Sequence, residues 1–225
     1  MKYSALLLLA APGVAHADAL QDQVLAGARA SRDSDYAFTR RMVIERSGAA
    51  RTVIVHRFDP RRALAERWTL VSVDGRAPTA KEIAQTRKGA KQPVPHYGEI
   101  AKWFGAPATR TASAPGTATY RFAQLPKDTL KLGSHDASPH TGAEAVVNTN
   151  GKTPFVSEVR LTSTKAFRMA LVASVKTLTF RNHYRLGTDG RPVPQDGAGD
   201  IAGSLLGKSG QIRTSVTYSD FVPAR

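Results

Sequence analysis

The chain has 225 residues, enough for one domain with a full hydrophobic core, and it contains no cysteine. Disulfides, cysteine nucleophiles and lipid attachment at a cysteine are therefore excluded. The formal net charge is +14, but the basic residues are scattered and never form a run longer than two. We therefore expect a solvated basic surface and no nucleic-acid partner.

The N-terminus predicts export. Lys2 precedes an apolar run over 5–11, and Ala15-His16-Ala17 has the small–x–small pattern of a signal-peptidase site. The run is too short to span a bilayer, which takes about 20 apolar residues. We expect residues 1–17 to be a cleaved signal peptide and 18–225 to form a single periplasmic domain.

The first part of the mature chain predicts a helix and then three strands. Asp18 can cap a helix whose apolar residues recur at helical spacing as far as Ala28. Alternation of apolar and polar residues indicates strands over 36–45, 51–58 and 67–73. A cation, Arg40, falls on the apolar face of the first strand.

The middle of the chain predicts a helical insertion. Thr79 and Glu82 have the spacing of a capping box, which would begin a helix that ends near Lys88. A second helical piece follows over 97–104. We expect residues 106–115, which are low in hydrophobicity, to be a mobile linker.

The last third predicts more strands. Residues 127–142 are polar and irregular, and alternating segments follow over 143–149, 155–186 and 211–222. The glycine-rich segment 196–206 fits either a poorly packed strand or a long loop. A hairpin turn is expected at Lys208-Ser209-Gly210.

Strands that alternate in this way normally form an antiparallel sheet. The expected fold is α+β, mainly β. It is a strongly curved antiparallel sheet, or half-barrel, with the N-terminal helix and the helical insertion covering its concave face. Such a fold leaves a groove between sheet and helices, lined by the apolar alternates.

Short motifs then resemble a known family. Phe58-Asp59-Pro60, Trp68-Thr69-Leu70 and Val73-Asp74-Gly75, with Pro78-Thr79 behind them, are similar to the outer-membrane lipoprotein carrier and sorting superfamily. The terminal strand segment 215–220 is similar in placement. The resemblance implies a periplasmic protein whose half-barrel holds acyl chains of lipids or lipoproteins, without a cofactor. It also implies relatives that bind regulators of envelope stress.

The candidate ligand-binding residues share the apolar faces of the predicted strands. They are Tyr36, Phe38, Arg40, Met42, Trp68, Leu70, Phe155, Phe167, Met169, Phe180 and Tyr184. Plain packing in the core is the more common role for each apolar member taken alone. Arg40 is more informative, because a cation on an apolar face is unfavourable unless it is paired or reaches water.

Other chemistry finds little support. The segment 203–209 has three residues between its glycines where a phosphate loop needs four. His135-Asp136 and His140 have metal-ligand types but no third histidine or cysteine nearby, so no metal is expected. His56 and His183 fall within strands and are expected on the wet face. Without a catalytic constellation, we predict a protein that is not an enzyme.

The leading hypothesis is a non-enzymatic periplasmic protein that binds acyl chains of a lipid or lipoprotein, a monomer that makes transient membrane contact. The alternative is a structural or regulatory module of the same fold whose groove is filled and which binds an envelope protein. A third hypothesis is an anionic-surface binder, driven by the charge of +13 that remains when cleavage removes Lys2.

Overall fold

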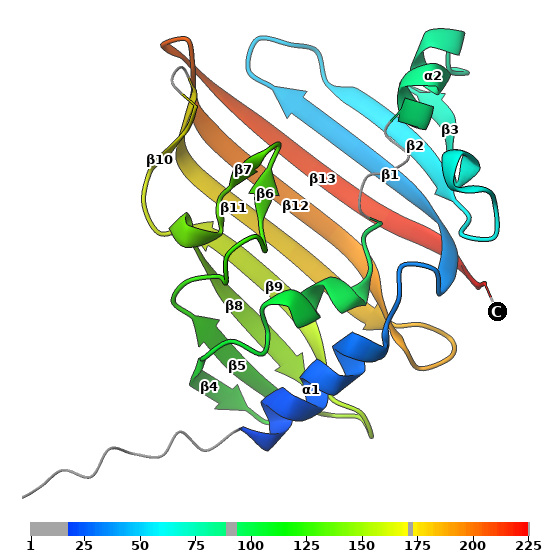
Figure 1. Cartoon of the computed structure of the whole chain (residues 1–225). Helices are drawn as coiled ribbons and strands as arrows, with labels where there is room; N and C mark the ends of the chain where they lie inside the picture. Colours follow the sequence, from blue (N-terminus) through cyan, green and yellow to red (C-terminus); the bar gives the residue numbers. More distant parts are fainter. Residues whose placement is uncertain (1–17, 89–93, 171–172, 225) are drawn as a thin grey trace, which may run out of the picture.

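The computed structural model describes residues 18–88, 94–170 and 173–224, so the predicted signal peptide lies outside the described residues. One large antiparallel sheet dominates the chain (Figure 1). Its strands are β1 (Tyr36–Arg46), β2 (Thr52–Phe58), β3 (Trp68–Val73), β4 (Thr109–Ala114), β5 (Thr117–Phe122), β8 (Thr141–Asn148), β9 (Phe155–Ser163), β10 (Phe167–Ala170), β11 (Ala173–Leu186), β12 (Pro192–Leu205) and β13 (Lys208–Pro223).

The strand order is β3-β2-β1-β13-β12-β11-β9-β8-β5-β4, with β10 pairing beside β11. Neighbours in sequence are mostly neighbours in the sheet: β11–β9 and β8–β5 skip only β10 and the β6–β7 hairpin, and the long-range exception is the pairing of β1 with β13. That pairing joins the first three strands to the rest of the chain. The sheet is strongly curved and is not closed into a barrel.

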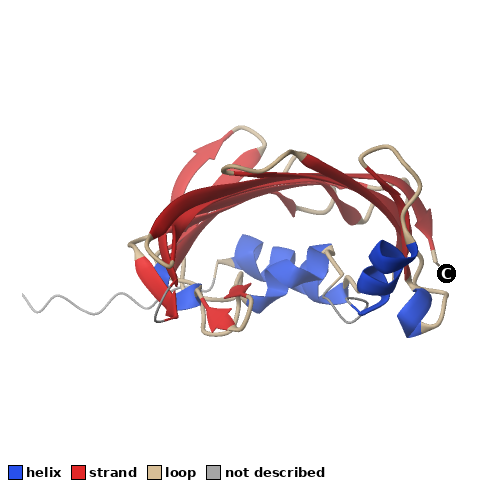
Figure 2. Ribbon diagram, turned by 90° about the horizontal axis from the view of Figure 1, so that it is seen from above, coloured by secondary structure: helices blue, strands red, loops and turns tan. Residues whose placement is uncertain are grey.

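The helical segments lie on the concave side of the sheet (Figure 2). They are α1 (Ala19–Ala30), η1 (Leu64–Glu66), α2 (Ala80–Lys88), η2 (Tyr97–Lys102) and η3 (Ser138–His140). A separate two-stranded hairpin is formed by β6 (Lys131–Leu132) and β7 (His135–Asp136). The predicted fold class is therefore confirmed.

Helix α1 forms where the sequence predicts it. The Asp18 carboxylate accepts hydrogen bonds from the backbone N–H groups of Leu20 (2.9 Å) and Gln21 (3.4 Å), which satisfies two donors at the first turn. The buried face of the helix, Val24, Leu25 and Ala28, packs in one cluster with the aromatic residues that follow η2.

Helix α2 begins with the predicted capping box. The Glu82 carboxylate accepts from the backbone N–H of Thr79 (2.7 Å), and the Thr79 hydroxyl accepts from the backbone N–H of Glu82 (3.3 Å). No residue of this helix is buried. Helix α2 therefore sits at the edge of the sheet beside β3 and covers little of the concave face (Figure 1).

Two predictions for irregular segments are corrected. Residues 106–115, expected to be a mobile linker, contain the edge strand β4, which pairs with β5 alone. An edge strand with one partner and exposed faces needs few apolar residues, so its period-two signal is weak. Within 127–142, expected to be irregular, the β6–β7 hairpin and η3 form.

The glycine-rich segment is a strand, which decides between the two expected alternatives. It forms most of β12, between β11 and β13. The turn that ends it lies at Leu206-Gly207 and not at 208–210 as predicted, since both turn residues have positive φ (50° and 77°). The residues 208–210 belong to β13.

Candidate functional site on the concave face

Three buried clusters occupy parts of the concave face. The first lies between α1, η2 and strands β5, β8 and β9, and includes Phe104, Tyr120 and Val156. The second contains Phe38, Phe58 and Trp68 on β1, β2 and β3. The third lies under the β6–β7 hairpin, around Phe167 and Leu178. Helices or hairpins cover most of this surface, but not all of it.

A band of half-buried apolar side chains lies between the clusters, which we call the concave band. Cross-strand pairing places its members on one face: Met42 is opposite both Ile54 and Val216, and Ile201 is opposite Ile212. The band consists of Met42, Ile44, Ile54, Phe180, Ile201, Ile212 and Val216, none of which is fully buried. Figure 1 shows no helix over the far halves of β12, β13 and β1, toward their hairpin tips.

Two glycines lie in the middle of this band. Gly197 and Gly199 on β12 face the same side as Val216 and Phe180, their partners on the flanking strands. A Cβ on Gly199 would lie 2.7 Å from the Phe180 ring, and one on Gly197 would lie 2.7 Å from the Asn182 side-chain oxygen. The glycines therefore let the Phe180 ring and the Asn182 side chain lie across β12.

Arg40 stands at one end of the concave band. It lies opposite His56 on β2 and Tyr218 on β13, and its guanidinium carbon is 4.2 Å from the centre of the Trp68 ring. Its Nε is buried and has no hydrogen-bond partner. Every Asp and Glu of the chain lies within the described residues, and none of them forms an ion pair with Arg40. Burial lowers the pKa of Arg40.

His56 is the neighbour of this cation, which corrects the prediction that it lies on the wet face. Its side chain is on the concave face, only 8% exposed, with its ring edge against Trp68. Burial, and then the nearby charge of Arg40, lower the pKa of His56 to about 4. Its Nδ1 has no hydrogen-bond partner. The sequence carried this signal, since His56 alternates in phase with Ile54 and Phe58.

Two tyrosines lie on the same face as Arg40. Tyr218 lies directly opposite it, while Tyr184 on β11 packs with the first cluster, edge-on against Tyr97, with ring centres 5.3 Å apart. Burial raises the pKa of both Tyr184 and Tyr218, so both phenols stay neutral at physiological pH. The site thus combines one unpaired cation, one neutral imidazole and neutral hydroxyls, a set suited to an anion.

The structure distributes the predicted lining residues over several places. Phe38, Arg40, Trp68 and Leu70 come together at the cationic end, with Met42 next along β1. Phe180 contributes to the band, while Phe167 and Met169 belong to the third cluster, and Phe155 and Tyr184 to the first. Tyr36, at the start of β1, packs edge-on against Phe221 with ring centres 5.9 Å apart, and its hydroxyl donates to the Asp189 carboxylate (2.6 Å).

The sequence reasoning missed part of the site. Its candidate ligand-binding residues did not include His56, Tyr218, Ile54, Ile44, Val216, Ile201 and Ile212. The last strand was predicted over 211–222 from its alternation, but its place beside β1 could not be predicted from order along the chain. Because β13 pairs with β1, Val216 and Tyr218 join Met42 and Arg40.

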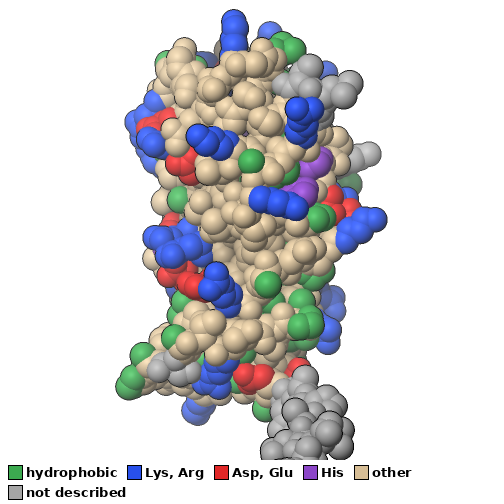
Figure 3. Space-filling view, turned by 90° about the vertical axis from the view of Figure 1, so that its left-hand side faces the viewer, with side chains coloured by type: hydrophobic (Ala, Val, Ile, Leu, Met, Phe, Trp, Pro, Cys, Tyr) green, Lys and Arg blue, Asp and Glu red, His purple; other side chains and the backbone are tan. Residues whose placement is uncertain are grey.

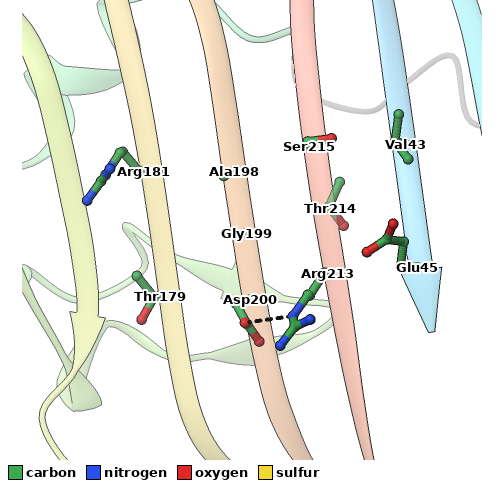
Figure 4. Close-up of a pocket in the computed structure, with 10 residues that line it drawn as sticks. All are labelled: Val43, Glu45, Thr179, Arg181, Ala198, Gly199, Asp200, Arg213, Thr214 and Ser215. Atoms are coloured by element: carbon green, nitrogen blue, oxygen red, sulfur yellow. Dashed lines mark hydrogen bonds and ion pairs between the residues drawn. The ribbon is translucent and has the colours of Figure 1, made fainter. Parts of the chain in front are cut away.

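The convex face carries a shallow depression of about 400 Å³ (Figure 4). Its floor is formed by small residues of β12 such as Ala198. Charged side chains around it already have partners: Arg213 pairs with Asp200 (3.3 Å) and Arg181 with Glu158 (3.3 Å). Arg213 and Arg181 therefore already form ion pairs with acids of the same face, whereas Arg40 does not.

The histidines of the third cluster pack as rings. His135 and His140 each stack on Phe167, with ring centres 5.5 and 4.8 Å away. Within the described residues no group of three or more His, Cys, Asp or Glu side chains could hold a metal ion. Figure 3 views the molecule from the left of Figure 1, and shows Lys and Arg spread among acids on that face.

Comparison of the chain with models of known families, with curated proteins and with solved structures finds no match. The resemblance to the lipoprotein carriers therefore stays a prediction. In the described part of the chain, no helix is long and apolar enough to cross a membrane.

Proposed function

We propose that the protein is a non-enzymatic binding protein for anionic amphiphiles, with an acyl chain along the concave band and the anionic group at Arg40. The half-buried guanidinium of Arg40, whose Nε is buried without a hydrogen-bond partner and which has no acid beside it, is the observation that carries this proposal. A cation that is largely withdrawn from water without a counter-charge is unfavourable, and an anionic ligand would supply the missing partner. Trp68 and Tyr218 would then flank the ion pair and exclude water.

The concave band supports the apolar part of the ligand. Its side chains lie half-exposed on a face that is elsewhere covered, and they continue from Arg40 toward the tips of the central strands. Burying such surface stabilises a complex by about 25 cal/mol per Å² of apolar area. An acyl chain fits a long, narrow apolar strip that has a charge at one end.

In this proposal the protein is periplasmic, released by cleavage after Ala17, and it carries a lipid or the acyl chains of a lipoprotein as a monomer. It needs no cofactor for this role, and nucleic acid is not among its ligands. The open sheet, the concave helices and the short motifs around Trp68 are consistent with a lipoprotein carrier or a relative of one.

The test is titration with 11-(dansylamino)undecanoic acid, an anionic fluorescent acyl chain. The wild type should bind it saturably with one site. Arg40→Gln should weaken binding about tenfold or more, as expected for loss of a charged partner. Arg41→Gln, the adjacent cation on the opposite face, is the matched control and should bind as the wild type does.

A second ligand distinguishes the contribution of the anionic group from that of the acyl chain. The methyl ester of the same probe should bind wild type and Arg40→Gln equally, because it offers no anion to the guanidinium. If the acid binds all three proteins alike, Arg40 is not the anchor. If neither probe binds the wild type, the groove proposal fails.

The second candidate is a protein-interaction module for an envelope partner. The open edge of β4 favours it, because this strand pairs only with β5 and its other backbone edge can accept a further strand. Recovery of one stoichiometric partner from envelope extracts, lost on Thr111→Pro in β4, would support this role. An unchanged recovery with that variant would exclude strand addition at β4.

A further inference from the structure

The tip of the β12–β13 hairpin carries two leucines in water. Leu206 is 72% exposed and Leu205 61% exposed, the two most exposed large apolar side chains among the described residues. We call Leu205, Leu206, Gly207 and Lys208 the leucine tip. Single exposed leucines are common on protein surfaces, but a pair at the end of a long hairpin is a concentrated apolar feature.

The backbone makes this pair more unusual. Leu206 (φ 50°) and Gly207 (φ 77°) form a two-residue hairpin loop in which both residues have positive φ. Such loops strongly favour Asn-Gly or Asp-Gly, because a branched apolar residue is disfavoured in the left-handed region. The other non-glycine residues with positive φ in the described ranges, Asp74, Asp128 and Asp220, are all aspartates.

Leucine at position 206 is thus unfavourable in two ways: its backbone has a positive φ, and its apolar side chain is exposed to water. Asn at this position would relieve both, so neither folding nor solubility accounts for the leucine. Removal of the side chain from water by a partner does account for it. The partner must accept two leucines at the end of a narrow hairpin without a matching pocket, as the interfacial region of a bilayer does.

The charges beside the tip define the kind of bilayer. Lys208 lies directly across from Leu205. At the same end of the sheet, Arg46 ends β1 and Arg51 lies just before β2, on either side of the adjacent β1–β2 turn (Figure 1). One acid, Glu45, lies 3.9 Å from Arg51 in an exposed ion pair. Basic side chains beside an exposed apolar pair are complementary to a surface of anionic lipid headgroups.

We propose that the leucine tip is a membrane-docking element, inserted with Leu205 and Leu206 into an anionic lipid bilayer. The concave band reaches toward this end, since Ile201 and Ile212 face each other there across β12 and β13. Docking would bring the open end of the band to the lipid surface. The docking does not depend on the ligand site at Arg40, which lies farther along β1.

The test is co-sedimentation of the purified, exported protein with sucrose-loaded vesicles, its N-terminus established by mass spectrometry. Vesicles contain phosphatidylcholine alone or with 30% phosphatidylglycerol, a composition chosen as about one anionic lipid in three. We expect the wild type to bind the anionic vesicles and to bind less as salt rises. Leu206→Asn should lower the partition coefficient about tenfold or more, the effect of losing one inserted leucine.

Leu64→Asn is the matched control, because Leu64 is 54% exposed in η1 at the opposite end of β2 from the β1–β2 turn. It should leave vesicle binding unchanged. Leu206→Asn should unfold at the same temperature as the wild type or higher, and should bind the acyl probe normally. Equal vesicle binding by Leu206→Asn and wild type would overturn the proposal, as would an equal loss with Leu64→Asn.

Insertion has its own readout. Tryptophan in place of Leu206 (Leu206→Trp) should show blue-shifted emission and quenching by brominated lipids only in anionic vesicles. Emission that stays unshifted while the protein sediments would show surface attraction without insertion, and would contradict the proposed role of the leucines.

Discussion

The concave face of a single sheet has two regions that differ in their cover. Over β5, β8 and β9, helix α1 and η2 bury Phe104 and Tyr120 completely. Over β1, β12 and β13, apolar side chains of the same face stay half-exposed, and Arg40 is half-buried without a counter-charge. The first region is a covered hydrophobic core. The second region has similar apolar side chains, but no helix or hairpin within the described ranges covers them.

The difference teaches that one strand pattern can serve two purposes. Alternation alone gives the same prediction for both regions, because each strand needs one apolar face. Whether an apolar face is buried depends on segments that are distant in sequence. In the first region these segments are α1 and η2. Where such a layer ends, the same apolar alternates stay partly exposed.

The largest expected effect distinguishes the two regions by stability. Phe104→Ala in the covered region should lower the free energy of unfolding by about 3–5 kcal/mol, because it leaves a cavity among buried rings. Val216→Ala in the concave band should lower it by less than about 1 kcal/mol, since part of that side chain is already in water. Urea unfolding measures both, and equal losses would show that the band is ordinary core.

The next effect is the pH dependence from His56. Its pKa is about 4 in the folded protein against an ordinary value of 6.5. The unfolded chain therefore binds this proton first as pH falls. Stability from this site is complete above pH 6.5 and is lost between pH 6.5 and 4, by at most about 3 kcal/mol.

His56→Gln should remove that part of the pH dependence. Urea midpoints at pH 7, 5.5 and 4.5 for the variant and wild type check this, and the difference between the two proteins isolates the histidine. Parallel pH profiles would contradict the buried position of His56. An anionic ligand should raise the pKa of His56, so wild-type binding should tighten as pH falls from 7 to 5.

Replacement of the half-buried cation Arg40 should change stability in the opposite sense. Arg40→Met should raise the free energy of unfolding of the ligand-free protein by about 1–3 kcal/mol, because an apolar chain of similar length suits this place better than an unpaired charge. It should also abolish selective binding of an acyl anion. Arg41→Met, on the exposed face, should change neither quantity. Destabilisation by Arg40→Met would mean that the charge already has a favourable partner.

The smallest change in stability should accompany a large change in binding. Val216→Trp adds a bulky ring to the concave band. The free energy of unfolding should stay within about 0.5 kcal/mol of the wild-type value, because the ring extends into open space. The same variant should lose uptake of the acyl probe. Ser215→Trp places an equal ring on the convex face and should retain uptake. Equal binding by the two variants would move the ligand away from the band.

Much of the fold could be predicted from local patterns. The Asp18 cap, the Thr79–Glu82 capping box and the period-two strands all form as expected, because each depends on neighbours in sequence. Strand β4 could not be predicted, since an exposed edge strand needs no apolar face. The Leu206-Gly207 turn was missed because leucine gives no turn signal.

The candidate site was predictable only in part. The position of Arg40 on an apolar face followed from alternation, and the same reasoning applied to His56 would have placed it correctly. The absence of an acid beside Arg40 could not be predicted, because the neighbours of Arg40 depend on the pairing of β13 with β1. The extent of the open band depends likewise on where α1, η2 and the β6–β7 hairpin end.

Native mass spectrometry tests the central claim most directly. The protein, purified without detergent, is incubated with equimolar palmitate and sprayed from volatile buffer, beside Arg40→Gln and Val216→Trp. The account predicts one bound palmitate on the wild type, released by collision, and mainly bare polypeptide for both variants. A bare wild-type polypeptide, or equal occupancy of all three proteins, would contradict a groove built from the concave band and Arg40.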